Sequence, residues 1–322
     1  MKTEEIIALQ GINGIGSAAI SKVISYLEHK NAESLLDVDI SELLKHSDIS
    51  RYRKKLEGVL TKDFVTEQIA VASHKLHLYK QNNIHVISIT DSLYPASLKL
   101  ISTPPELLFC KGNLKLLSQN KNVAVIGTRD NTCLGEAITR KTTHFIVSKG
   151  YNVVSGLALG IDAIAHDECL NCFGKAIAVL VDVDNVQPTK NKGLAERIIT
   201  SGGLLISENA PGIPIVAPLF VKRDRIQAGL SLAVFPIETS VNGGTMHAVN
   251  VAKATGRLIY IPDPAHSGYE DKSIKQLSGI IALAQEPEVT PYTKKNYAFI
   301  CDSLIRKEIE LFSGTENQGS LF

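Results

Sequence analysis

Residues 176–181 read Ala-Ile-Ala-Val-Leu-Val, a short run without a polar side chain. A strand with one solvated face alternates apolar and polar residues, so a continuous apolar run predicts burial on both faces. Central strands of parallel sheets have this composition, because helices cover both sides of such a sheet. The run therefore predicts an α/β domain built on a buried parallel sheet.

Similar runs rich in valine and isoleucine lie on both sides of this segment, and helical patterns separate most of them. This alternation predicts a doubly wound, mostly parallel sheet over about residues 82–265. The predicted strands are 85–89, 107–110, 123–126, 152–154, 176–181, 204–206, 232–236 and 258–261.

The flanking regions have other patterns. In residues 1–81 apolar residues recur at three- and four-residue steps, which predicts an N-terminal helical domain. Its glycine-rich segment, residues 11–16, predicts a hairpin between two helices. Those glycines suit either contact with a DNA phosphate or an ordinary helix C-cap. Residues 266–322 predict a C-terminal helical extension, with a helix near Tyr297–Phe312 and a flexible tail from residue 313.

Composition narrows the function classes. The net charge is +1 over 322 residues, so the protein does not coat duplex DNA through bulk charge, and any nucleic-acid site is local. No apolar run reaches 18 residues and the acidic start lacks a signal-peptide pattern, so a cytoplasmic protein is expected.

Cys169 and Cys172 form a single C-x-x-C, which we interpret as two ordinary thiols rather than a metal site.

Small and polar residues follow several predicted strands, and ligands of parallel sheets bind at that edge. Residues 127–129 (Gly-Thr-Arg), 155–156 (Ser-Gly) and 242–245 (Asn-Gly-Gly-Thr) each join a strand to a helix start, where backbone N–H groups bind phosphate. The dinucleotide pattern G-x-G-x-x-G is absent from the first turn, so no cofactor is expected.

Residues 220–231 carry a further signal, which we interpret as a loop at the same edge. Lys222, Arg223 and Arg225 lie beside Phe220, and cations next to an aromatic ring suit single-stranded DNA. Asp224 interrupts the cations, and the alternative interpretation is that one arginine pairs with Asp224 while the other cations are solvated. The predicted DNA- and phosphate-binding residues are Gly127, Thr128, Arg129, Ser155, Gly156, Phe220, Lys222, Arg223, Arg225, Gly243, Gly244 and Thr245.

Three of these motifs, in this order, resemble the DNA-processing protein A family (DprA/Smf). They are Gly127-Thr128-Arg129, the stretch from Ser155 to His166, and Phe220-x-x-Arg223-Asp224-Arg225. The resemblance covers about residues 90–262. It implies an extended Rossmann-like domain, with an N-terminal domain similar to helix-hairpin-helix or SAM domains.

The resemblance also implies a function without a catalytic step. Members bind single-stranded DNA and load the RecA recombinase, often as homodimers, in natural transformation (competence) and recombination. This sequence departs from the family where it has Arg223-Asp224-Arg225 instead of Arg-Asn-Arg. It also lacks a recognisable C-terminal winged helix. These departures weaken the inferred role in transformation more than the inferred fold.

Two further hypotheses remain open. Residues 242–245 resemble part of the signature of phosphoribohydrolases, so a nucleotide sensor or hydrolase is the alternative, with Glu238 as the one nearby carboxylate. The tail residues Gln318, Leu321 and Phe322 resemble the peptide by which bacterial proteins dock on the sliding clamp.

Overall fold

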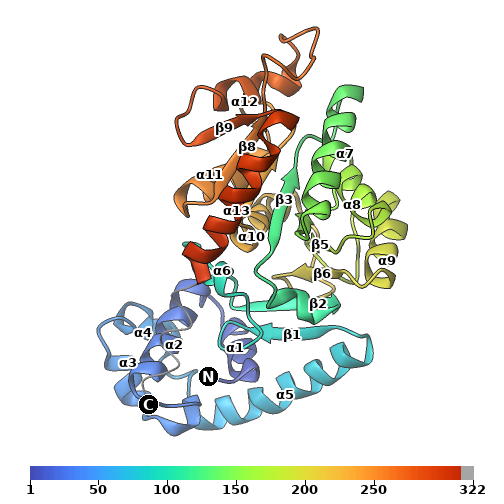
Figure 1. Cartoon of the computed structure of the whole chain (residues 1–322). Coiled ribbons are helices and arrows are strands. Elements are labelled where there is room, and N and C mark those ends of the chain that lie inside the picture. Colours follow the sequence, from blue (N-terminus) through green and yellow to red (C-terminus); the bar gives the residue numbers. More distant parts are fainter. Residues whose placement is uncertain (313–322) are drawn as a thin grey trace. The chain divides into compact units, whose positions relative to one another are not determined.

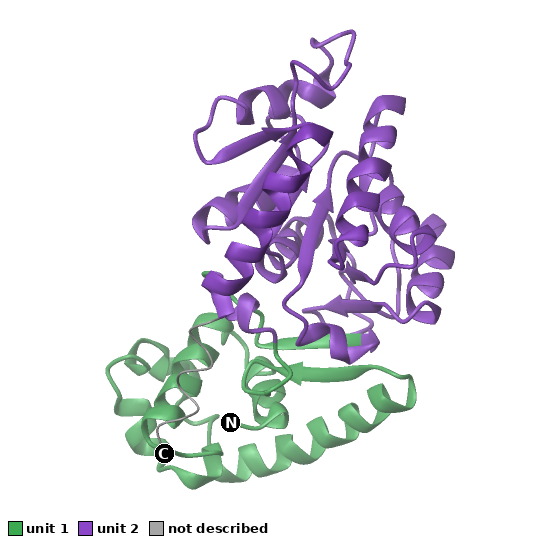
Figure 2. Cartoon of the chain, viewed as in Figure 1, with its two compact units in different colours: residues 1–94, 102–110 green, residues 95–101, 111–322 purple. Residues whose placement is uncertain are grey.

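The computed structural model describes residues 1–312 (Figure 1), so the hypothesis of a clamp-docking peptide falls on residues outside the described part, Gln318, Leu321 and Phe322. The chain divides into two compact units (Figure 2). The first comprises Met1–Tyr94 and Ser102–Cys110, and the second comprises Pro95–Ile101 and Lys111–Phe322. No helix within residues 1–312 has the length and apolarity needed to cross a bilayer.

The first unit is mainly helical, as its three- and four-residue apolar spacing predicts. The predicted hairpin is confirmed, since residues 11–16 join the first two helices and Gly14 has a φ of +77°. Lys55 donates to the Gly14 carbonyl oxygen at 2.9 Å. The elements are α1 (Thr3–Gln10), α2 (Ser17–His29), α3 (Ile40–Lys45), α4 (Arg53–Leu56), α5 (Lys62–Gln81) and the antiparallel pair β1 (His85–Ser88) and β2 (Leu107–Gly112).

The second unit contains a parallel sheet with the strand order β6-β5-β4-β3-β7-β8-β9. Every predicted strand of this region is confirmed, and the apolar run at 176–181 contains a fully buried strand. The strands are β3 (Asn122–Ile126), β4 (Asn152–Ser155), β5 (Ala176–Val179), β6 (Leu204–Ser207), β7 (Ala233–Pro236), β8 (Leu258–Pro262) and β9 (Val289–Tyr292).

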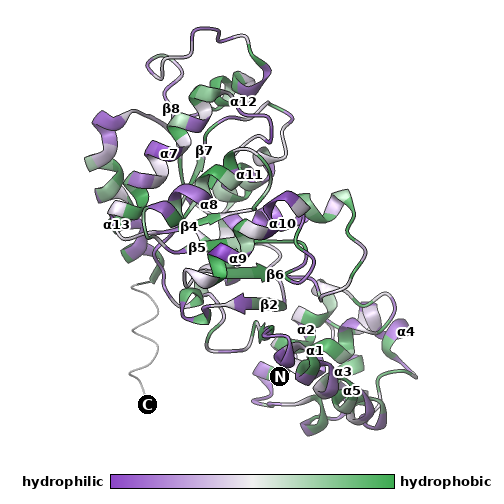
Figure 3. Cartoon of the chain, turned by 90° about the vertical axis from the view of Figure 1, so that its right-hand side faces the viewer, coloured by the Kyte–Doolittle hydropathy of each residue, from purple (hydrophilic) through white to green (hydrophobic). Residues whose placement is uncertain are grey.

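Helices cover both faces of this sheet, which confirms the doubly wound α/β class. On one face α7, α8 and α9 pack in series, while α10 and α11 pack together on the other, as Figure 1 shows. The strands between them are hydrophobic, and β6 is coloured accordingly in Figure 3. The helices are α6 (Ala96–Lys99), α7 (Cys133–Ser148), α8 (Ile161–Asn171), α9 (Lys192–Thr200), α10 (Ala217–Leu230), α11 (Thr245–Ala254), α12 (Lys275–Leu283) and α13 (Tyr297–Phe312).

The C-terminal region differs in part from the sequence-based expectation. Helix α13 has the predicted bounds, Tyr297–Phe312. The sequence did not predict α12 or β9, although β9 pairs with β8 and extends the sheet. Residues after 265 therefore include a strand of the sheet as well as helices.

Candidate functional site

The strand order reverses between β3 and β7, because the chain runs outward from β3 to β6 and then returns to β7. Ligands of open α/β sheets bind at such a switch point, beyond the carboxyl ends of the strands. A cavity of about 340 Å³ lies there. The predicted site residues that line it are Gly127, Thr128, Arg129, Phe220, Arg223, Gly243, Gly244 and Thr245.

The turn after β3 is held tightly on two sides. The Thr128 N–H donates to the Glu238 backbone oxygen at 2.8 Å, and the Ile161 N–H donates to the Thr128 oxygen at 3.2 Å. A methyl group on Gly127 would overlap the Ile161 side chain, so only glycine allows this approach. The turn therefore presents Arg129 from a fixed backbone.

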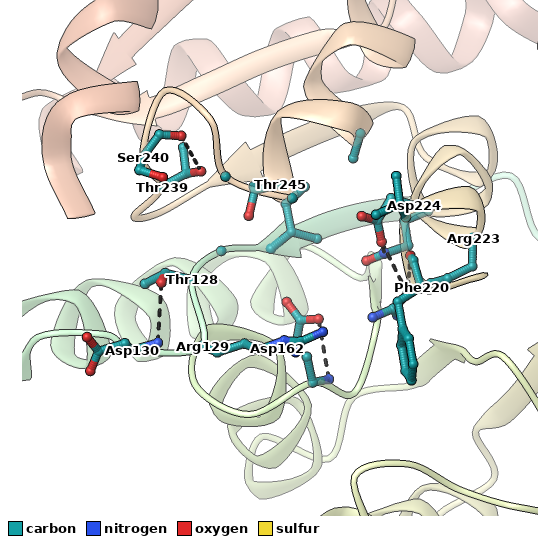
Figure 4. A pocket seen from close by; sticks show the side chains of 18 residues that line it. Thr128, Arg129, Asp130, Asp162, Phe220, Arg223, Asp224, Thr239, Ser240 and Thr245 are labelled. Carbon is teal, nitrogen blue, oxygen red and sulfur yellow. Dashed lines mark hydrogen bonds and ion pairs between the residues drawn. The ribbon is translucent and has the colours of Figure 1, made fainter. Parts of the chain in front are cut away.

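Arg129 is the exposed cation of the cavity. Its guanidinium carbon lies 5.8 Å from the centre of the Phe220 ring, a cation–π distance. Arg129 forms no salt bridge within residues 1–312. Figure 4 shows it extending into the space between the two sides of the cavity. A cation beside an aromatic face suits a phosphate and its base.

The N-terminus of α11 forms the opposite side, where Figure 4 shows Thr239, Ser240 and Thr245. Gly243 and Gly244 precede the helix, and its first N–H groups favour an anion. Thr239 and Ser240 were not among the predicted residues. They lie in the segment between β7 and α11, so the rule that located the other turns would also have found them.

The prediction of a loop at 220–231 is wrong, because residues 220–230 belong to α10 and Ser231 is its C-cap. Pro218 sits in the first turn of α10, where proline is compatible with a helix. The helix places Phe220 and Arg223 on its cavity side, one turn apart. Lys222 and Arg225 are not among the cavity-lining residues.

Glu208 binds these two cations. Its carboxylate accepts bidentate hydrogen bonds from Arg225, both of 2.7 Å, and lies 3.0 Å from the Lys222 Nζ. Both cations lower the pKa of Glu208 against the effect of its burial, which is the largest influence. One arginine does pair with Asp224, namely Arg223, while Arg225 pairs with Glu208.

Arg223 is buried and serves the fold. Its Nη1 donates to the Val179 oxygen at 2.6 Å, and its Nε lies 3.1 Å from Asp224. The guanidinium covers Gly156, where a methyl group would overlap it. Gly156 therefore allows the arginine to lie over its backbone and, like Ser155, does not line the cavity.

Ser155 and His166 are also internal. The Ser155 Oγ donates to the Val125 oxygen at 2.7 Å, and both side chains are fully buried. Burial lowers the pKa of His166 to about 4, so its imidazole is neutral at pH 7. Asp162 does not cap α8, because Gly160 is the N-cap residue. Its carboxylate instead accepts from the Gly156 N–H at 3.2 Å.

Asp224 faces the cavity with its side chain 14% exposed. Burial raises its pKa to about 7, Arg223 opposes this rise, and the nearby Asp162 adds to it. The Gln227 Nε2 donates to its Oδ1 at 2.8 Å. The charge of the cavity therefore changes near neutral pH.

Glu238 acts as a buried acceptor behind the cavity. It accepts from the Thr132 N–H at 2.9 Å, the Thr132 hydroxyl at 2.6 Å and the Tyr269 hydroxyl at 2.9 Å. Thr132 caps α7, so this carboxylate fixes the start of that helix. A fully buried, hydrogen-bonded glutamate is not in a position to contact a ligand in the cavity.

Known proteins share this sequence and fold. The family model of DNA recombination-mediator protein A matches residues 85–284. DNA processing protein DprA of Bacillus subtilis is 29% identical over 225 residues, which cover 69% of this chain and 75% of that protein. The X-ray structure of DprA from Streptococcus pneumoniae is 28% identical, with a TM-score of 0.73, and the match covers 93% of this chain and 98% of that one.

A second solved structure concerns the single-stranded DNA binding mode of DNA processing protein A from Helicobacter pylori. Its TM-score is 0.59 at 23% identity, and the match covers 69% of this chain and 96% of that one. The family model covers more than half of the chain and includes the strands β3 to β8, the three turns and α10. The chain therefore belongs to the DNA recombination-mediator protein A family, the DprA/Smf family that its motifs resemble.

Proposed function

We propose that this protein binds single-stranded DNA in the cavity at the switch point. The observation that carries the proposal is Arg129, an exposed cation over the Phe220 ring, opposite the N-terminus of α11. The guanidinium and the helix N–H groups suit a phosphate, while the aromatic ring suits a base. The binding mode described for the Helicobacter pylori relative supports the same class of ligand.

We further propose the role of a recombination mediator, in which the protein protects single-stranded DNA and loads the RecA recombinase, as a homodimer. Membership of the family supports this role, and so do the relatives named for DNA processing. The function requires no bond-breaking step. Glu238, the carboxylate that the hydrolase alternative needs, is engaged in three hydrogen bonds, which favours binding over catalysis.

The direct test measures binding of labelled oligo-dT against the matched duplex at several salt concentrations. We expect single strands to bind more tightly, because stacking on Phe220 requires an unpaired base. The affinity should fall with salt, with a slope of about −0.7 per phosphate neutralised. Equal binding of duplex, or no binding at low salt, would contradict the proposal, and nucleotide binding would then be tested for the sensor or hydrolase alternative.

Asp224→Asn tests the charge of the cavity. The pKa of Asp224 is about 7, so its carboxyl is largely neutral at pH 6 and ionised at pH 8, where it repels a phosphate. We expect wild-type affinity for oligo-dT to fall between pH 6 and pH 8 by about threefold or more. The asparagine variant should bind more tightly at pH 8 and show a flatter profile.

The same substitution has an effect on stability with a defined sign. The folded protein keeps the proton of Asp224 up to about pH 7, whereas an unfolded chain loses it near the ordinary value. The folded state therefore binds more protons between about pH 4 and pH 7, and the free energy of unfolding falls as pH rises through this window. Urea unfolding should show this loss in the wild type and less of it in Asp224→Asn. Identical pH profiles for the two proteins would exclude Asp224 as the cause.

A further inference from the structure

His144, Glu168 and Cys172 form a cluster away from the cavity. His144 lies on α7, Glu168 on α8, and Cys172 is the C-cap of α8. The two helices pack side by side (Figure 1). The His144 Nδ1 is 3.3 Å from the Cys172 Sγ, and the Sγ is 3.4 Å from the Glu168 Oε1. The ligand atoms of all three residues lie within 4.8 Å of one another.

These distances fit a tetrahedral metal site. Zinc binds sulfur at about 2.3 Å and nitrogen or oxygen at about 2.0–2.2 Å, so ligand atoms around it lie roughly 3.3–3.6 Å apart. Two of the three pairs already have this separation. The combination of an imidazole, a thiol and a carboxylate is also one that zinc accepts, whereas magnesium and calcium prefer oxygen alone.

Arg140 orients the Glu168 carboxylate through the oxygen that does not contact the thiol. Its Nη1 lies 3.2 Å from the Glu168 Oε2, while the Oε1 faces the thiol. Each oxygen of Glu168 thus has its own partner, and the Oε1 can bind a metal while Arg140 keeps the carboxylate oriented. Conserved metal sites use outer hydrogen bonds of this kind to fix their ligands.

The electrostatics of the cluster favour a cation. Cys172 lies at the C-terminal end of α8, where the helix dipole is negative, and one turn after Glu168. The Glu168 carboxylate, whose Oε1 lies 3.4 Å from the Cys172 Sγ, adds a negative charge beside the thiol. His144 is exposed and offers an approach from solvent.

We propose that His144, Glu168 and Cys172 bind one zinc ion, with water as the fourth ligand. This site is not a pair of ligands from the C-x-x-C motif, because it uses only the second of the two cysteines. Cys169 is fully buried and is not among the three residues whose ligand atoms lie together. The ligand that replaces it, His144, comes from the neighbouring helix.

Cobalt(II) titration of the reduced full chain tests the proposal, because a cobalt–thiolate bond gives a near-ultraviolet charge-transfer band. We expect a band that saturates at one equivalent and that zinc abolishes by displacement. Cys172→Ser should remove the band, and His144→Ala or Glu168→Gln should weaken cobalt binding at least tenfold. Cys133→Ser, which removes an exposed thiol at the start of α7, is the matched control and should leave the band unchanged.

Absence of the band in the wild type, or its persistence in Cys172→Ser, would overturn the proposal. His144→Ala covers the case in which the cysteine variant fails to fold, because an exposed histidine is removed at little cost to stability. Full cobalt affinity in a folded His144→Ala variant would equally overturn it. None of these measurements depends on DNA binding, so a failure of the zinc proposal can be distinguished from a failure of the proposed function.

Discussion

Arg129→Ala should weaken binding of oligo-dT by about ten- to a hundredfold, since it removes both a charge-assisted phosphate contact and a cation–π partner. The side chain is exposed and forms no salt bridge among the described residues, so its loss leaves no buried group without a partner. The free energy of unfolding should therefore stay within about 0.5 kcal/mol of the wild-type value. Fluorescence anisotropy at several salt concentrations measures the binding, and the slope should shrink by about 0.7.

Arg197→Ala provides the matched control. Arg197 is also an exposed arginine of the second unit, but it lies on α9 and pairs with Asp167 at 2.9 Å. Its removal takes away the same charge and should change the affinity less than threefold. An equal loss in both variants would mean that net charge, and not the cavity, governs binding.

Gly160→Ala should lower the free energy of unfolding by about 3 kcal/mol or more. Gly160 has φ +75° and ψ −131°, a region that only glycine enters easily. A methyl group there would also approach the Arg129 backbone carbon and Cα to 2.8 Å. Backbone atoms cannot rotate away as a side chain can, so the turn after β3 must shift. Urea unfolding measures the loss, and binding of oligo-dT should weaken with it.

Gly193→Ala is the control for this substitution. Gly193 lies in α9, and a methyl group on it would meet no atom within 4 Å. Alanine favours a helix over glycine by up to about 1 kcal/mol, so this variant should be as stable as the wild type or more so. If Gly160→Ala unfolded at the wild-type urea concentration, the strain at this turn would be refuted.

The sheet was predictable because its strands are buried on both faces, and such strands need continuous apolar runs whatever their neighbours. Residues 176–181 and 123–126 show this clearly. The sequence did not predict β9, because it is an edge strand with Pro291 in its middle. Its residues have neither the continuous apolar run of a buried strand nor a regular apolar spacing. Its pairing with β8 is a tertiary fact that no local pattern contains.

The candidate site was predictable in its turns and not in its charges. Residues 127–129 and 243–245 meet at one edge because parallel strands end there. The sequence did not indicate that Glu208 pairs with the cations of α10. Glu208 lies 17 residues before Arg225, and no pattern in the intervening sequence links the two. Likewise, the sequence did not indicate that Arg223 is buried whereas Arg129 is exposed, because the apolar residues of α10 follow no regular helical pattern.

The overlap between Arg223 and any side chain at position 156 bears on how this protein can change over generations. A bulkier residue at 156 excludes the guanidinium from its place, and a shorter residue at 223 removes the reason for a glycine at 156. The two positions, 67 residues apart in the chain, should therefore vary together or not at all. Replacement of Arg129 obliges no second substitution, so only its proposed role in DNA binding would constrain that position.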